Sequence, residues 1–117
     1  MFSKIYIIAE IAQAHDGSLG ILHSYIDAAS KTGANAVKFQ MHYADAESST
    51  SEPFRVNFSY EDKNRFEYWK RMELSFNQWK EIKDHCESVN LEFLVSPFSI
   101  KAVNTLELLK VKKYKKL

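Results

Sequence analysis

The sequence predicts an α/β protein built around a parallel β-sheet. Segments with the composition of buried strands alternate with segments whose apolar residues recur at the helical period. Serine and glycine residues stand where such helices would begin and end. The chain has 117 residues, 45% of them hydrophobic, which is enough for a packed core in one domain.

The first strand is expected over Lys4–Ala12, where isoleucine is frequent and both faces should be buried, as in other parallel strands. Asp16–Ser18 follows as a turn with capping side chains. Apolar residues then recur at helical spacing from Ile21 to Ala29, and Gly33 suits the residue just beyond the end of that helix.

A second strand is expected over Ala36–Gln40. A long polar stretch, from about Met41 to Leu74, separates it from the next helix. Stretches of this length in a compact domain are usually functional or locally structured. Within it, Tyr68–Arg71 is expected to be a partly packed loop segment rather than a recognition site.

The next helix is predicted to begin after Ser75, because Gln78 stands three residues on, as in a capping box. The third strand is predicted over Leu91–Val95, and Ser99 is expected to cap the last helix. The apolar sides of these two helices are Trp79, Ile82, Cys86 and Val89 in the first, and Ala102, Val103, Leu106 and Leu109 in the second.

Two architectures satisfy this order of elements, an open doubly wound sheet and a (β/α)8 barrel. A barrel of about 250 residues has about 31 residues in each βα unit. The chain therefore holds about three to four units, the fourth represented by the start of a strand at Lys112–Leu117. As a barrel, residues 1–117 form an incomplete, N-terminal portion, truncated after the start of the fourth strand.

Charge and composition exclude several functions. The net charge is +1, but five of the 16 basic residues lie in Lys110–Leu117, so the remaining chain is mildly acidic and no nucleic-acid partner is expected. Glu10 interrupts the first apolar run, so no membrane span is expected. The three glycines cannot form a Rossmann fingerprint or a P-loop. Cys86, as the single cysteine, fits a reducing, cytoplasmic location.

Four polar residues are predicted to lie at one end of the sheet. Alternation along the second strand places Lys38 and Gln40 on the side opposite to its apolar residues. These two residues, like Glu10 and Ser96, stand at or near the C-terminal ends of strands, where active sites of parallel sheets and barrels form. A buried lysine is costly unless it is paired or binds an anion. Lys38 therefore forms a structural ion pair with Glu10, extends to the rim, or binds an anionic ligand.

None of the histidines stands at a spacing typical of metal ligands, so spacing predicts no metal site in this chain. His15 is expected to be a turn residue rather than a ligand. His42 follows the second strand, whereas His23 and His85 fall on predicted helices.

Three segments resemble motifs of the sialic acid synthases, which condense phosphoenolpyruvate with a sugar to make N-acetylneuraminate. They follow the family's order: Ala9–Ser18 (AEIAQAHDGS), Gly33–Gln40 (GANAVKFQ) and Phe93–Phe98 (FLVSPF). The resemblance spans nearly the whole chain.

Two further segments, Glu52–Arg55 and Tyr68–Glu73, resemble a bacterial subgroup that includes spore-coat polysaccharide synthases. Ala12 and Ala14 depart from the family, most of whose members carry Gly and Asn there. The departures bear on the loop after the first strand, and so on the choice of sugar acceptor.

The resemblance implies a TIM barrel that condenses phosphoenolpyruvate with the aldehyde of an N-acetylated amino sugar such as N-acetylmannosamine, releasing phosphate, in carbohydrate and polysaccharide biosynthesis. By this resemblance Lys38 holds an anionic group of phosphoenolpyruvate and Glu10 lies beside the reacting carbons. Ser96 donates to the phosphate, and Gln40 binds the sugar. His15 also matches a position of the family motif, but the resemblance gives it no catalytic step.

The resemblance also implies a divalent metal, usually manganese, that polarises the aldehyde as a Lewis acid. In the family its histidine ligands lie on later barrel strands, outside this chain, and the full-length enzymes are homodimers. An incomplete barrel could also self-associate.

Two alternatives remain. One is a non-catalytic half-barrel, or a module that folds only by self-association. The other makes Lys38 the Schiff-base nucleophile of an aldolase-type barrel.

Overall fold

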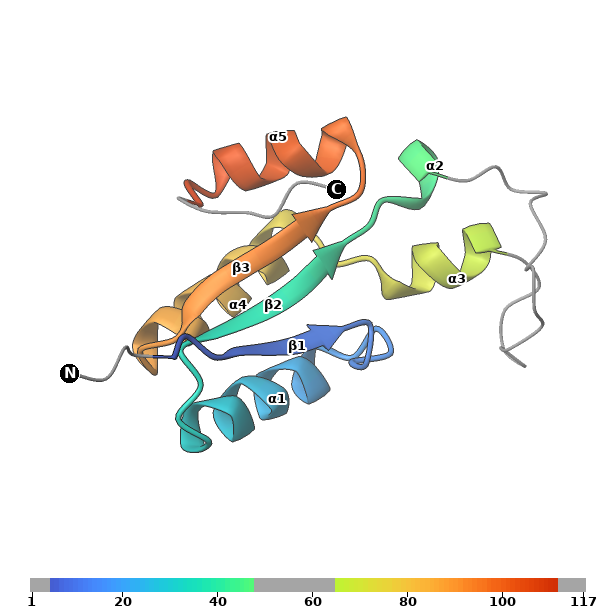
Figure 1. Ribbon diagram of the computed structural model, residues 1–117. Coiled ribbons are helices and arrows are strands. Elements are labelled where there is room, and N and C mark those ends of the chain that lie inside the picture. Colours follow the sequence, from blue (N-terminus) through green and yellow to red (C-terminus); the bar gives the residue numbers. More distant parts are fainter. Residues whose placement is uncertain (1–4, 48–64, 112–117) are drawn as a thin grey trace.

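The computed structural model describes residues 5–47 and 65–111 (Figure 1). The elements in chain order are β1 Ile8–Ala12, α1 Leu19–Lys31, β2 Ala36–Met41, α2 Ala44–Glu47, α3 Arg65–Met72, α4 Phe76–Ser88, β3 Glu92–Pro97 and α5 Ile100–Leu108. The strands form one sheet in the order β1-β2-β3, and both neighbouring pairs are parallel. The predicted α/β class with a parallel sheet is confirmed.

One face of the sheet packs against the helices. Val37 and Phe39 of β2 stand beside Phe93 and Val95 of β3, and all four side chains are buried. The Phe39 ring contacts both Phe93 and Trp79 of α4, with centroids 5.5 and 6.1 Å apart. Figure 1 shows α1 beside β1 and α5 beside β3, with α4 behind the sheet. The helices contribute further fully buried side chains to this core: Leu22, Ile26, Ile82, Cys86 and Leu106.

The predicted helix ends are confirmed at the serine N-caps and at the glycine that follows α1. Ser18, Ser75 and Ser99 are the N-caps of α1, α4 and α5, and each hydroxyl accepts a backbone N–H three residues on. Ser75 and Gln78 form the reciprocal capping box. Gly33 follows α1 with φ +82°, a left-handed conformation that suits glycine.

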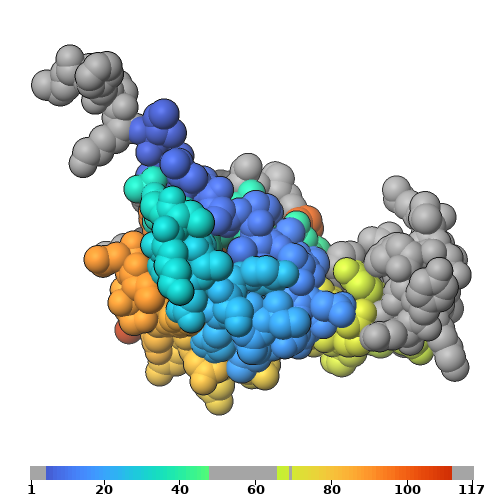
Figure 2. Space-filling view, turned by 90° about the horizontal axis from the view of Figure 1, so that it is seen from below, coloured from blue at the N-terminus to red at the C-terminus, as the bar shows by residue number. Residues whose placement is uncertain are grey.

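The first strand is shorter and more exposed than the sequence predicts. Regular pairing begins at Ile8, and Ile5 is 80% exposed. The prediction that both faces are buried is wrong for residues 5–8, because β1 is an edge strand among the described elements and no neighbour covers its outer side. Figure 2 shows these first described residues, in dark blue, at the periphery of the molecule.

The long polar stretch contains two short helices, α2 and α3, among its described residues. The prediction of a loop for Tyr68–Arg71 is wrong, because these residues lie in α3. The predicted start of a fourth strand at Lys112–Leu117 and the motif Glu52–Arg55 lie outside the described residues. None of the described helices is long and apolar enough to span a membrane.

Candidate functional site at the C-terminal ends of the strands

The strand register brings the four predicted site residues to one region of the sheet. Glu10 is the Cα partner of Lys38, and Gln40 is the partner of Ser96. In parallel strands, side chains that stand side by side project from the same face. All four therefore lie on the face opposite to the core, toward the ends at which the strand arrows of Figure 1 point.

Lys38 and Glu10 form an ion pair, with 3.5 Å between Nζ and Oε2. The Lys38 side chain is 18% exposed and that of Glu10 is 44% exposed. Among the described residues, Glu10 is the only partner of the Lys38 ammonium group. A lysine ammonium has three donors, so Lys38 keeps donors available for an anionic ligand while it holds Glu10.

Ser96 presents a buried hydroxyl on β3, the strand next to that of Lys38. The residue is 8% exposed, and within the described ranges its hydroxyl has no hydrogen-bond partner. Buried polar groups in native proteins are nearly always paired, so such a group indicates a missing water or ligand. The site thus offers a cation and an unpaired donor on neighbouring strands.

His42 joins the site, and the sequence analysis gave it no role there. Its Nε2 lies 2.9 Å from Oε1 of Gln40, and its Nδ1 lies 2.9 Å from Oε1 of Glu47. The imidazole stacks on the ring of Phe98, with centroids 4.2 Å apart. The sequence could have indicated this position of His42. Lys38, Gln40 and His42 stand at every second residue, and such residues share one face of an extended strand.

The loop after β1 is anchored beside the site by His15, which is 1% exposed. Its Nδ1 accepts the backbone N–H of Gly17 at 3.0 Å, which confirms the prediction of a turn residue. Burial lowers the pKa of His15 below its usual value of 6.5, and the charge of Asp16 partly opposes this. Gly17 has φ +78°, and a Cβ there would lie 2.6 Å from the carbonyl oxygen of Arg71. A side chain at this position would therefore push the loop away from α3.

The other two histidines lie away from the site, between α1 and α4. The Nδ1 atoms of His23 and His85 are 2.6 Å apart, and Nε2 of His85 lies 2.7 Å from Oδ1 of Asp27. In the part of the chain that the structure describes, no three His, Cys, Asp or Glu side chains converge to hold a metal ion. The described residues therefore do not fit the expected manganese, and we assign it no step here.

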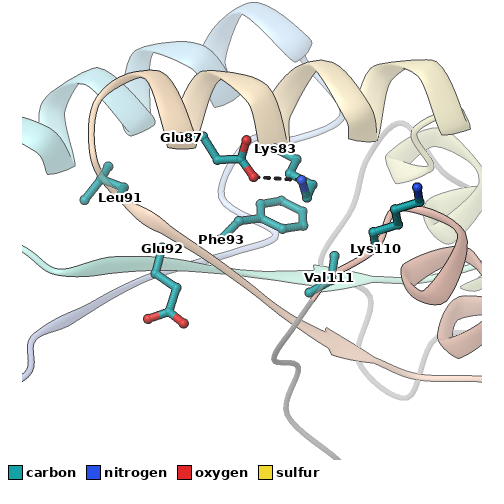
Figure 3. Close-up of a pocket in the computed structure, with 7 residues that line it drawn as sticks. All are labelled: Lys83, Glu87, Leu91, Glu92, Phe93, Lys110 and Val111. Atoms are coloured by element: carbon teal, nitrogen blue, oxygen red, sulfur yellow. Dashed lines mark hydrogen bonds and ion pairs between the residues drawn. The ribbon is translucent and has the colours of Figure 1, made fainter.

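A pocket of about 240 Å³ lies at the other end of β3 (Figure 3). Lys83 and Glu87 form an ion pair on its α4 side, with 2.7 Å between Nζ and Oε1. Leu91–Phe93 supplies the strand side. The pocket contains none of the four predicted site residues and so is separate from the candidate site.

The fold and the site are those of the first βα units of a parallel barrel with its polar residues at the C-terminal ends of the strands. The sequence matches the NeuB family over residues 25–116, and the chain belongs to this family. The resemblance to sialic acid synthases is thereby confirmed.

Curated relatives agree with this assignment. The chain is 31% identical over 115 residues to N,N'-diacetyllegionaminic acid synthase of Campylobacter jejuni, covering 96% of this chain and 34% of the relative. It is 33% identical over 92 residues to the spore coat polysaccharide biosynthesis protein SpsE of Bacillus subtilis, covering 79% of this chain and 25% of the relative. The chain thus spans about a third or less of the length of these relatives.

Solved structures show the same fold. The N-acetylneuraminic acid synthetase of Leptospira borgpetersenii, in complex with citrate, superposes with a TM-score of 0.76 at 25% identity, covering 97% of this chain and 36% of that one. Bacillus subtilis SpsE superposes with a TM-score of 0.68 at 28% identity, covering 99% of this chain and 30% of that one. The predicted partial barrel is confirmed by this coverage.

Proposed function

We propose that this chain supplies the phosphoenolpyruvate-binding side of a nonulosonate synthase. The observation that carries the proposal is that the Lys38 ammonium and the buried Ser96 hydroxyl, which has no hydrogen-bond partner among the described residues, lie on adjacent strands and on the same face of the sheet. A fixed cation and a hydroxyl donor are the groups that bind a phosphate ester and stabilise the charge on it. Membership of the NeuB family supports a synthase of this class.

In the proposed reaction, the methylene carbon of phosphoenolpyruvate forms a bond to the aldehyde carbon of an N-acetylated amino sugar. Water adds to the enolpyruvyl carbon, and that carbon's bond to the phosphate oxygen breaks, which releases inorganic phosphate. Lys38 holds an anionic group of phosphoenolpyruvate, and Ser96 donates to its phosphate. Glu10 lies beside the reacting carbons.

Gln40 binds the sugar acceptor in this proposal. It stands beside Ser96 in the register and two residues beyond Lys38, so a ligand on these two donors reaches its amide. The reaction belongs, in this proposal, to cytoplasmic carbohydrate and surface polysaccharide biosynthesis, which agrees with the name of the SpsE relative, a spore coat polysaccharide biosynthesis protein.

The test is the binding of phosphoenolpyruvate to the purified chain, measured by isothermal titration calorimetry. Lys38→Met and Ser96→Ala should each weaken binding by tenfold or more, because each removes a group that contacts the anion. Lys31→Met is the matched control, since Lys31 is exposed in the last turn of α1. Equal weakening by Lys31→Met, or no binding by the folded chain, contradicts the proposal.

A second arm separates this function from a Schiff-base aldolase. The amine of an aldolase lysine forms a covalent Schiff base with a carbonyl substrate, whereas the proposed function uses Lys38 only as a cation beside Glu10. Borohydride reduction in the presence of pyruvate should therefore leave Lys38 unlabelled, as determined by peptide mass spectrometry. Labelling at Lys38 would favour the aldolase.

A further inference from the structure

Two histidines face one another across the contact between α1 and α4. The Nδ1 atom of His23 lies 2.6 Å from the Nδ1 atom of His85. The ring centroids are 4.8 Å apart and the ring planes differ by 28°, so the two rings meet edge to edge through these nitrogens. The side chains are 30% and 18% exposed, respectively. The pair is therefore partly buried but can be reached from solvent.

Each histidine also faces a carboxylate of the opposite helix. Nε2 of His85 lies 2.7 Å from Oδ1 of Asp27, and Nε2 of His23 lies 3.6 Å from Oε2 of Glu81. On each helix the histidine and the carboxylate stand four residues apart, and residues at this spacing share one helix face. Within the described ranges, these four side chains bond only to one another.

The two Nδ1 atoms are close enough to need a proton or a metal ion between them. An unprotonated imidazole nitrogen presents a lone pair in the plane of its ring, and two such lone pairs repel at this distance. In the ligand-free chain, a proton from either ring fills the position. A metal ion can replace this proton, which then passes to solvent or to Nε2 of His23 beside Glu81. Both nitrogens become ligands, whichever ring carried the proton.

The two carboxylates match the surroundings of metal-bound histidines. A histidine that binds a metal through one nitrogen usually donates its other N–H to a carboxylate, which fixes the orientation of the ring. Asp27 is in this position for His85, and Glu81 is in the corresponding position for His23. Tetrahedral zinc with bonds of about 2.0 Å holds two nitrogens about 3.3 Å apart, so the Nδ1 atoms would need to separate by less than about 1 Å.

We propose that His23 and His85 form a two-histidine binding site for a divalent transition metal ion such as Zn²⁺, independent of the site at the strand ends. Imidazole nitrogen suits zinc, copper and nickel, whereas manganese and magnesium prefer oxygen. In the described part of the chain no third His, Cys, Asp or Glu side chain converges on the pair, so water completes the coordination shell. The ion would link two helices through residues 62 positions apart, and should stabilise the native chain because the unfolded chain separates them.

The binding test is a titration of Zn²⁺ into the full chain, followed by isothermal titration calorimetry, in which one ion per chain should bind. His23→Gln and His85→Gln each remove a ligand and should abolish this binding. Asp27→Asn keeps both ligands but removes the carboxylate behind one of them, so it should weaken binding about tenfold. His15→Asn and Asp84→Asn are the matched controls and should leave the affinity unchanged, because neither side chain bonds to the pair in the described residues. Unchanged affinity in both glutamine variants, or Mn²⁺ binding as tightly as Zn²⁺, overturns the proposal.

Spectra of the wild-type chain identify the ligands even if a variant fails to fold. In the chain labelled with 15N, Zn²⁺ should shift the Nδ1 resonances of His23 and His85, leave both Nε2 atoms as N–H donors, and leave the resonances of His15 and His42 unchanged. The melting temperature should rise with Zn²⁺ in the wild-type chain and stay constant in His85→Gln. Shifts confined to other histidines, or no shift in excess Zn²⁺, would show that only a hydrogen bond joins the pair, and the proposal would fail.

Discussion

Lys38 has a modest structural role in the fold and, under the proposed function, a larger role in binding an anion. Its ion pair with Glu10 is partly exposed, and pairs of this kind contribute about 0–1 kcal/mol to folding. Under the proposed function, the same cation on the middle strand of the sheet would act on a phosphate ester with two negative charges, for which a fixed cation has a far larger effect. A substitution of Lys38 should therefore change the free energy of unfolding little and the affinity for an anionic ligand much more.

Lys38→Ala should lower the free energy of unfolding by less than about 1 kcal/mol, measured by urea denaturation. In a longer synthase that carries this segment, the same change should abolish most turnover. Lys38→Arg should fail as well, because a planar guanidinium does not replace a compact ammonium. Near-normal turnover combined with a lower melting temperature in Lys38→Ala would show instead that the ion pair with Glu10 is structural.

His15 makes the stability of the chain depend on pH. Burial lowers its pKa, so below pH 6.5 the unfolded chain binds a proton that the native His15 does not. Stability should therefore fall as the pH falls from 7 to 5, by at most about 1.4 kcal/mol per pH unit from this residue. His15→Asn, whose side-chain oxygen can still accept the Gly17 N–H, should show a shallower decline in urea denaturation at these pH values. Identical slopes in both proteins would contradict this assignment.

At the scale of elements, the ends of the helices could be predicted from the sequence, because they depend on residues close together in the chain. Ser75 with Gln78 specified the start of α4, and Gly33 specified the end of α1, because capping depends on neighbouring residues. The exposure of residues 5–8 depends on which strand lies at the edge, which is a property of the whole sheet. The alternation of Lys38, Gln40 and His42 indicated which side of the strand His42 shares, whereas its contact with the Phe98 ring arises only in the fold.

The bulge at the end of β1 gives a local prediction. The pairing with β2 shifts between Glu10 and Ala12, and Ala12 takes φ +50°, a left-handed conformation that is unfavourable for a residue with a Cβ. Ala12→Gly should therefore raise the free energy of unfolding by about 0.5–1 kcal/mol.

Ala14→Gly is the matched control, because Ala14 is not among the described residues with positive φ. It should be neutral or destabilising, since glycine adds freedom only to the unfolded chain. Both variants are compared by urea denaturation at pH 7. A loss of stability in Ala12→Gly equal to that in Ala14→Gly would contradict the strain at Ala12.

At the scale of the whole molecule, the described chain exposes what a larger barrel would cover. β1 and β3 are the outer strands of the sheet, and the residues leading into β1 expose apolar side chains, with Ile5 at 80% and Ile7 at 51%. Unpaired strand edges with apolar flanks favour association. We expect the weight-average mass in sedimentation equilibrium to rise with concentration. Ile5→Lys with Ile7→Lys should reduce this rise, and an unchanged monomer in the wild-type chain would contradict the prediction.

The chain by itself should not synthesise a sialic acid. It spans about a third of the length of its relatives, and the described residues contain no group of ligands for the metal expected to polarise the aldehyde. Groups that act as a unit lose nearly all catalysis when several are missing, so the residues at the strand ends should bind phosphoenolpyruvate without turning it over. The chain would be incubated with phosphoenolpyruvate, N-acetylmannosamine and manganese, and phosphate release and nonulosonate formation would be measured against a control without protein. Product that Glu10→Ala or Lys38→Ala abolishes would show that these first βα units suffice for the reaction, and that the essential site lies wholly within them.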